Sequence, residues 1–130
     1  MAKSTYASNR CLTYLLPSAS VYLALFSTEP AVPAGIGGTE VSAAGTAYAR
    51  QAISFGAAAA GSVANSAQIT FAQATASWGT ITSFGIYDAA TGGNLLYVDV
   101  LPGGSIAINF TSGYGDQFVV PVGSLVISES

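Results

Sequence analysis

The chain has 130 residues, of which 51% are hydrophobic and only 7% are charged, and its formal net charge at pH 7 is −3. Its three cations cannot form the basic stripe that neutralises nucleic-acid phosphates or binds an anionic membrane, so neither is expected as a direct partner. The lack of histidine excludes a Ser-His-Asp or Cys-His catalytic device and any His-ligated metal, and a single cysteine permits neither an internal disulfide nor a cysteine-built zinc site.

The scarcity of charge predicts that much of the surface contacts other protein. Roughly a quarter of the residues of a typical soluble domain are charged, whereas protein interfaces are depleted of Lys, Glu and Asp. We therefore expect a homo-oligomer, either a dimer or a trimer, that also binds a second protein. The alternative is a soluble domain whose surface consists of Ser, Thr, Asn and Gln.

A helix is predicted only near the N-terminus, over residues 4–16 (STYASNRCLTYLL), where Ser4 can cap it and Pro17 ends it. One face of this helix would carry Ala7, Cys11, Tyr14 and Leu15. Its apolar run is too short for a signal peptide, and no apolar stretch is long enough to span a membrane, so we expect synthesis in a cytoplasm. Residues 1–19 are interpreted as an N-terminal arm with a short helix, and residues 20–130 as a single β-sandwich domain.

Strand patterns separated by glycine turns dominate the rest of the chain. The predicted strands cover residues 21–26, 48–55, 67–71, 79–87, 95–101, 105–110, 117–122 and 125–128. Val21–Phe26 is apolar on both faces, as expected of a central strand, and Gly79–Tyr87 alternates with period two. The pattern predicts an all-β fold: an antiparallel, jelly-roll-like β-sandwich of about eight strands with a short N-terminal helix.

Two segments lack a regular pattern. Residues 28–45 contain prolines and glycines and are predicted to form a long loop, and residues 55–66 (FGAAAAGSVANS) form a tight connection or a close-packed face.

Partner contacts are expected in two segments, residues 1–16 and residues 28–42. Both of these segments carry apolar side chains outside the strand pattern. The candidate anchors are Tyr6, Tyr14, Pro30, Pro33 and Ile36.

The stretch SWGTITSFGIYDAATGGNLL, residues 77–96, contains the only tryptophan, an acid and a double glycine. It reads as a strand, a turn and a strand, in which Asp88 hydrogen-bonds the turn backbone and Gly92 or Gly93 takes a positive φ. Trp78 is expected in the core or at an interface, and a sugar-stacking platform is the alternative.

The acidic residues suggest no enzyme. Two of the six could meet as the acid and base of a hydrolase, but their positions favour solvation or turn capping, and Asp99 is expected to face solvent or a partner. Arg50 is either solvated or paired with Asp88 or Glu40, and the pair is favoured because a buried unpaired cation is costly. Residues 35–39 resemble a phosphate-binding loop but lack the lysine and the helix. No catalytic, cofactor-binding or metal-binding residue is assigned, and no cofactor is expected.

Short motifs along the chain also carry a family resemblance. They are VYLALFSTEP (residues 21–30), GTEVS (38–42), YAR (48–50), WG (78–79), FGIYDA (84–89), GGNLL (92–96), GDQF (115–118) and GSLVI (123–127). In combination they resemble a family of small tailed-bacteriophage virion proteins, often labelled tail-fibre-like, whose jelly-roll relatives act as capsid cement proteins. The resemblance covers residues 20–128, and the first 19 residues match no part of it.

The resemblance implies a non-enzymatic virion structural protein. We expect a capsid cement (decoration) protein on the capsid surface that clamps the major capsid protein, where repetition over a lattice multiplies modest contacts. A tail-fibre or baseplate module that binds a host-surface glycan is the alternative. The sequence favours the lattice because it contains neither a long fibre repeat nor a coiled-coil stalk pattern.

Overall fold

The computed structural model describes residues 4–15, 21–29, 38–101, 104–111 and 113–128. These residues form one helix, α1 (Thr5–Leu15), and thirteen short strands. All the strand pairs are antiparallel, and they form an all-β, sandwich-like fold, which confirms the predicted fold class.

The first layer is a five-stranded sheet around one apolar strand. Its members are β1 (Tyr22–Thr28), β2 (Thr39–Glu40), β3 (Gln51–Ala52), β7 (Ser83–Tyr87) and β8 (Leu95–Val100). The order is β2-β1-β7-β8, and β3 also pairs with β1. Four consecutive residues of β1, from Leu23 to Phe26, are buried, so the prediction of a central strand is confirmed.

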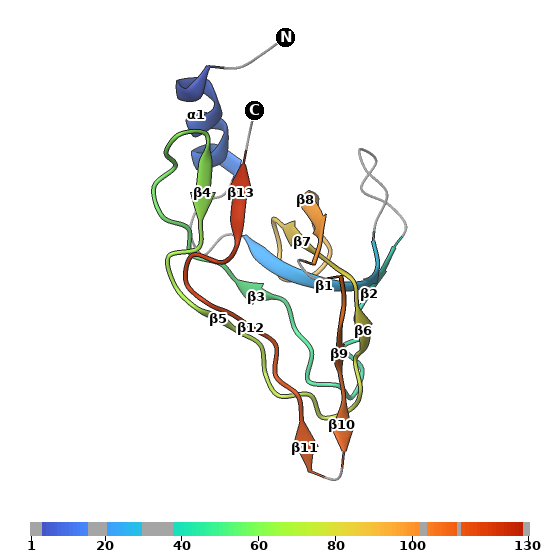
Figure 1. Cartoon of the computed structure of the whole chain (residues 1–130). Helices are drawn as coiled ribbons and strands as arrows, with labels where there is room; N and C mark the ends of the chain where they lie inside the picture. The colour runs from blue at the N-terminus through green and yellow to red at the C-terminus, as the bar shows by residue number, and fades with distance from the viewer. Residues whose placement is uncertain (1–3, 16–20, 30–37, 102–103, 112, 129–130) are drawn as a thin grey trace.

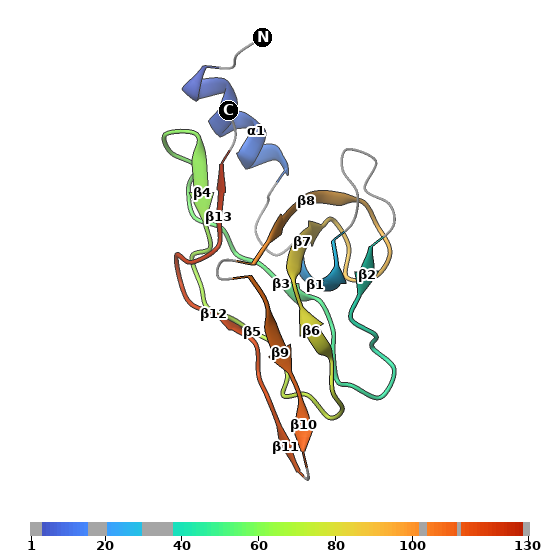
Figure 2. The ribbon, with the colours of Figure 1, turned by 45° about the vertical axis from the view of Figure 1, so that its right-hand side comes forward.

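The second layer consists of four two-stranded ribbons. They are β4 (Ser62–Ala64) with β13 (Val126–Ser128), β5 (Ile69–Thr70) with β12 (Val119–Val120), β6 (Gly79–Ile81) with β9 (Ile106–Ile108), and β10 (Phe110–Thr111) with β11 (Tyr114–Gly115). Figures 1 and 2 show α1, β4 and β13 at one end of an elongated molecule and the β10–β11 hairpin at the other.

Between the layers lies one apolar core that contains an aromatic cluster. The ring centroid of Trp78 lies 5.4 Å from that of Tyr48 and 6.1 Å from that of Phe71, edge-on in both cases. The indole nitrogen of Trp78 donates a hydrogen bond of 2.8 Å to the carbonyl of Thr46, and only 6% of the residue is exposed. Trp78 is therefore a core residue, and its face is not available for stacking on a sugar.

The helix begins where the sequence predicts, but it packs through a different face. Ser4 Oγ accepts a hydrogen bond from the amide of Ala7 (3.1 Å), as an N-cap does. Ser8 and Leu12 are the buried side chains, and α1 lies on β4, near which Asn9 Oδ1 accepts a hydrogen bond from the amide of Gly61.

The predicted helix face is therefore wrong in part. Tyr14 is 84% exposed, and Cys11, which is predicted on the same face, is only partly buried. The helix turns its Ser8 and Leu12 side to β4 because the small serine allows a close approach and Leu12 enters the core. The side chain of Leu15 lies outside the described residues.

The strand predicted over residues 79–87 is divided at Thr82, where the chain passes from one layer to the other. The amide of Thr82 donates to the carbonyl of Phe26 (2.9 Å), and its carbonyl accepts from the amide of Leu101 (3.0 Å). Before this residue β6 pairs with β9, and after it β7 pairs with β1 and β8. A period-two pattern alone cannot reveal such a change of partner, because side chains alternate in both halves.

Other predicted boundaries are also corrected. The predicted loop 28–45 contains β2, the flat segment 55–66 contains β4, and β11 lies outside every predicted strand. β4 follows a tight turn in which Ala60 and Gly61 have φ values of 53° and 77°. The predicted strand 48–55 is reduced to β3 and an isolated bridge at Phe55. The strands are thus more numerous and shorter than predicted.

One buried hydroxyl in the described part of the chain has no hydrogen-bond partner, that of Ser83 on β7. Because an unsatisfied buried hydroxyl costs about 1–3 kcal/mol, we expect Ser83→Ala to leave the free energy of unfolding unchanged or to raise it by about 1 kcal/mol. Urea unfolding measures this change. The control is Thr46→Val, since Thr46 Oγ1 donates to the carbonyl of Ser42 (2.5 Å), and its loss should lower the free energy of unfolding. Equal destabilisation by both substitutions would contradict the prediction.

Candidate functional site

The most polar cluster of the described structure is centred on Arg50. Its Nε and Nη2 each donate to one oxygen of the Glu40 carboxylate, both at 2.8 Å. This bidentate pair confirms the prediction that Arg50 is paired with an acid. Of the two predicted partners, Glu40 and Asp88, the partner is Glu40. Asp88, the other one, caps the following turn instead, where it accepts hydrogen bonds from the backbone and side-chain nitrogens of Asn94 (2.7 and 3.0 Å).

The remaining contacts of Arg50 hold the turn after β7. Nη1 donates to the carbonyls of Ala89 (3.0 Å) and Gly92 (2.8 Å), and the guanidinium carbon lies 3.7 Å from the ring centroid of Tyr87. Gly92 has a positive φ of 62°, as predicted for this turn. We call Glu40, Tyr48, Arg50 and Tyr87 the arginine clasp, because together they join β2, the segment before β3 and the β7–β8 turn.

Tyr48 completes the clasp from the core side. Its hydroxyl donates to Glu40 Oε2 (2.6 Å) and accepts from the amide of Leu25 in β1 (3.1 Å). Burial raises the pKa of Tyr48 far above its ordinary value, and the hydrogen bond to Glu40 raises it further. Burial also raises the pKa of Glu40, but the hydrogen bonds from Arg50 and Tyr48 and the arginine charge outweigh it and leave that pKa below 4.5.

These shifts keep Glu40 ionised and Tyr48 protonated near neutral pH, so neither group suits general acid–base chemistry there. A cavity of about 330 Å³ lies beside the clasp, lined by Val41, Ala43 and Thr91 among others. However, the guanidinium already donates to four protein oxygens. The clasp is therefore a device that holds the fold together.

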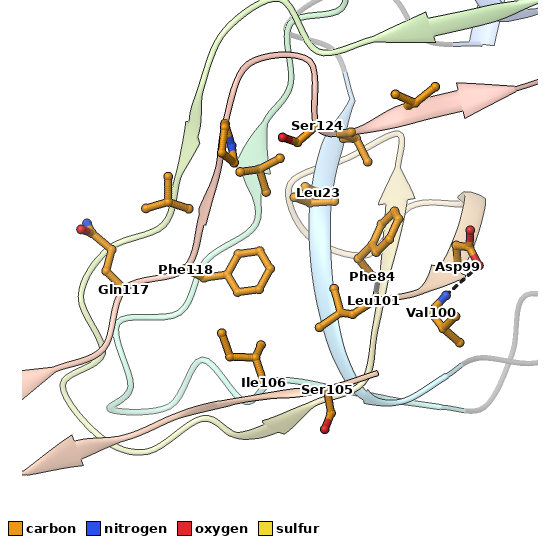
Figure 3. Close-up of a pocket in the computed structure, with 15 residues that line it drawn as sticks. Leu23, Phe84, Asp99, Val100, Leu101, Ser105, Ile106, Gln117, Phe118 and Ser124 are labelled. Carbon is orange, nitrogen blue, oxygen red and sulfur yellow. Dashed lines mark hydrogen bonds between the residues drawn. The ribbon is translucent and has the colours of Figure 1, made fainter. Parts of the chain in front are cut away.

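A larger cavity of about 520 Å³, which we call the apolar cleft, is lined by residues of both layers. The residues that line it are Leu23, Phe84, Asp99, Val100, Leu101, Ser105, Ile106, Gln117, Phe118, Val119, Val120, Pro121, Ser124, Leu125 and Val126. Figure 3 shows the ring of Phe118 pointing into it, opposite Leu23 and Phe84, while the Gln117 side chain points away. Of these described lining residues, Asp99 alone carries a charge.

The cleft exists because the two arms that lead to the β10–β11 hairpin diverge. They are still joined where the amide of Asp116 donates to the carbonyl of Asn109 (2.9 Å). Beyond this point Ile106–Ile108 pairs with β6, whereas Val119–Val120 pairs with β5. The arms therefore separate (Figure 2), and apolar side chains from both line the space between them (Figure 3).

Several of these side chains are exposed to an extent that is unusual for a cavity wall. The exposed fraction is 56% for Val100, 46% for Ile106, 39% for Val119 and 54% for Val126. A cluster of exposed aliphatic side chains around a concave surface is typical of a protein-binding site. The sequence contains one signal for it: residues 117–122, QFVVPV, are apolar on both faces although the strand lies near an edge.

Of the predicted interface residues, those that the structure describes do not line the cleft. Tyr6 and Tyr14 are 72% and 84% exposed on α1, and neither lines the cleft. Pro30, Pro33 and Ile36 lie outside the described residues. Asp99 is exposed, as predicted, and lies at the edge of the cleft, where its Oδ1 accepts a hydrogen bond of 2.8 Å from the amide of Val100.

The described residues bring no three His, Cys, Asp or Glu side chains together as a metal site would require. The single helix of the described residues is neither long enough nor apolar enough to cross a lipid bilayer.

Comparison with known proteins identifies the family. The family model described as podophage GP4 fiber I protein gp80 matches residues 2–128, and no curated protein matches the chain significantly. The match extends through the first 19 residues, so the expectation that these residues stand apart from the family was wrong. The resemblance to small tailed-phage virion proteins with a fibre-like label is confirmed. The chain belongs to the family of podophage GP4 fiber I protein gp80 and is a structural virion protein.

Proposed function

We propose that this chain is a non-enzymatic fibre subunit that attaches to neighbouring virion protein through the apolar cleft. The cleft is the observation that carries the proposal, because it leaves Val100, Ile106, Val119 and Val126 partly exposed around a concave surface. The matching family is that of a fiber protein, which supports the placement in a fibre.

The energetics suit assembly. Full burial of an aliphatic side chain stabilises a protein by about 1.5–3 kcal/mol. If a partner covers the four half-exposed side chains, their burial therefore contributes a few kcal/mol to the free energy of binding, before the costs of association are subtracted. The half-buried rings of Phe84 and Phe118 line the cleft together with these side chains. An apolar recess of this kind can receive a protruding side chain of a partner.

A capsid cement protein on the capsid surface, bound to the major capsid protein, is the second candidate. The low charge of the chain and the same cleft support it, because a lattice contact also requires an apolar surface. Binding of a host glycan has less support, since Trp78, the aromatic residue considered for it, is buried. Antibody labelling of purified virions distinguishes the candidates: label on the tail supports the fibre, whereas label over the whole head supports cement.

The role of the cleft is tested with a matched pair of substitutions in the phage. We expect Ile106→Lys to fold but to reduce incorporation into virions, because it places a charge in the cleft. Val122→Lys is the control, since Val122 is 62% exposed and is not a lining residue. Quantification of the chain in purified virions measures the effect. Normal incorporation of the Ile106→Lys protein would overturn the proposal.

A further inference from the structure

The outward side of α1 carries three side chains in one stripe. Tyr6, Arg10 and Tyr14 follow each other at intervals of four residues, so they lie on the same face of the helix. All three are exposed, and the guanidinium carbon of Arg10 lies 5.9 Å from the ring centroid of Tyr6. Tyrosine and arginine are the residue types enriched among the energetic centres of protein interfaces. We call these three residues the helix stripe.

The helix stripe and the apolar cleft are complementary in charge and in polarity. The stripe has one cation flanked by two aromatic rings, and the cleft has apolar walls with the Asp99 carboxylate at its edge. In Figure 3, Asp99 lies beside Val100, on the side of Phe84 away from Phe118. A tyrosine suits such a recess, because its ring can enter the apolar space while its hydroxyl reaches the wet edge.

Their sizes are also compatible. Two residues eight positions apart on a helix are separated by about 12 Å along its axis, so the stripe is a compact patch. A recess of about 520 Å³ is too small for a whole helix but accommodates projecting side chains.

The two surfaces do not meet within one chain. α1 is held on β4 through Leu12 in the core, and no described residue of α1 lines the cleft. Since both surfaces remain open on the same molecule, a second copy can supply the missing half of each contact.

We infer that the helix stripe of one copy docks into the apolar cleft of the next copy, with Arg10 facing Asp99. This inference rests on the proposed function and names the partner of the cleft. The contact joins two different surfaces, so it is heterologous and generates either a closed ring or a linear array of subunits. A fibre or its attachment ring requires such a contact.

A charge exchange in the 130-residue chain tests the inference. Arg10→Glu and Asp99→Lys should each weaken self-association by about tenfold or more, because each places like charges opposite one another. The double variant restores an opposite pair and should recover association to within about threefold. Sedimentation velocity over a range of concentrations at low salt measures this, since salt screens exposed charges. Glu29→Lys is the matched control, as Glu29 is exposed and lies outside the cleft.

A second measurement does not depend on charge. Tyr14→Ala should weaken self-association by about tenfold while the thermal transition stays unchanged, because its side chain is almost fully exposed. A wild-type chain that stays monomeric, or a double variant no better than the single ones, would overturn the inference. If Ile106→Lys reduces virion incorporation but the stripe variants do not, another virion protein occupies the cleft, and only the proposed function stands.

Discussion

Trp78→Ala is expected to lower the free energy of unfolding by about 3–5 kcal/mol, the usual cost of removing a large aromatic side chain from a core. Trp78 packs edge-on against Tyr48 and Phe71, and its indole N–H is the donor to the Thr46 carbonyl. The substitution therefore leaves a cavity and a buried carbonyl without its donor. Chemical denaturation followed by circular dichroism measures the loss.

Trp78→Phe serves as the control, because it keeps much of the ring volume and removes the N–H donor. It should cost about 1–2 kcal/mol, which corresponds to one buried hydrogen bond and a small cavity. Unchanged stability of Trp78→Ala together with a loss of partner or glycan binding would contradict the core assignment. Trp78 would then be a binding residue at the surface.

The features that the sequence predicts correctly are local ones. The Ser4 cap, the buried strand β1 and the Asp88 turn each depend on a few neighbouring residues, and all three are present. The pairing of Arg50 was also predictable, since a cation in so apolar a chain requires a partner. The choice of Glu40 from the two acids was not, because it depends on β2 lying beside β1.

The features that the sequence does not predict depend on distant pairing. β2 and β4 are too short to show a periodic pattern. β2 forms because β1 supplies its hydrogen bonds across the intervening loop, and β4 forms because β13, far along the chain, pairs with it. The change of layer at Thr82 and the separation of the hairpin arms follow from which strand each half pairs with. The cleft results from this separation, so its residues read in sequence as ordinary strand positions.

The arginine clasp allows a second large effect to be predicted. Arg50→Met keeps an unbranched apolar stem but removes the guanidinium with its charge and its donors, which leaves the partly buried Glu40 carboxylate without its main partner. Removing one member of a fully buried ion pair costs about 3–5 kcal/mol. Because the Glu40 side chain is 26% exposed and water can reach it, we expect a loss of about 2–3 kcal/mol at pH 7.

The pH dependence checks the cause of this loss. In the wild-type chain the Glu40 pKa is lowered in the folded state, so its contribution to stability is present above the unfolded pKa and disappears as pH falls through the folded pKa. In Arg50→Met, burial should instead raise the Glu40 pKa, so protonation favours folding. The difference in stability between the two proteins should therefore shrink as pH falls from 7 to about 3.

Glu40→Gln combined with Arg50→Met provides the control for this argument. The double variant has no ionisable group at position 40, so it should unfold with less dependence on pH than either the wild type or Arg50→Met. It should also be more stable at pH 7 than Arg50→Met, because a neutral amide costs less to bury than an unpaired carboxylate. Urea titrations of the three proteins at pH 7, 5 and about 3 measure both effects. A stability difference between wild type and Arg50→Met that stays constant over this range would show that the clasp acts through packing against Tyr87 and not through the Glu40 charge.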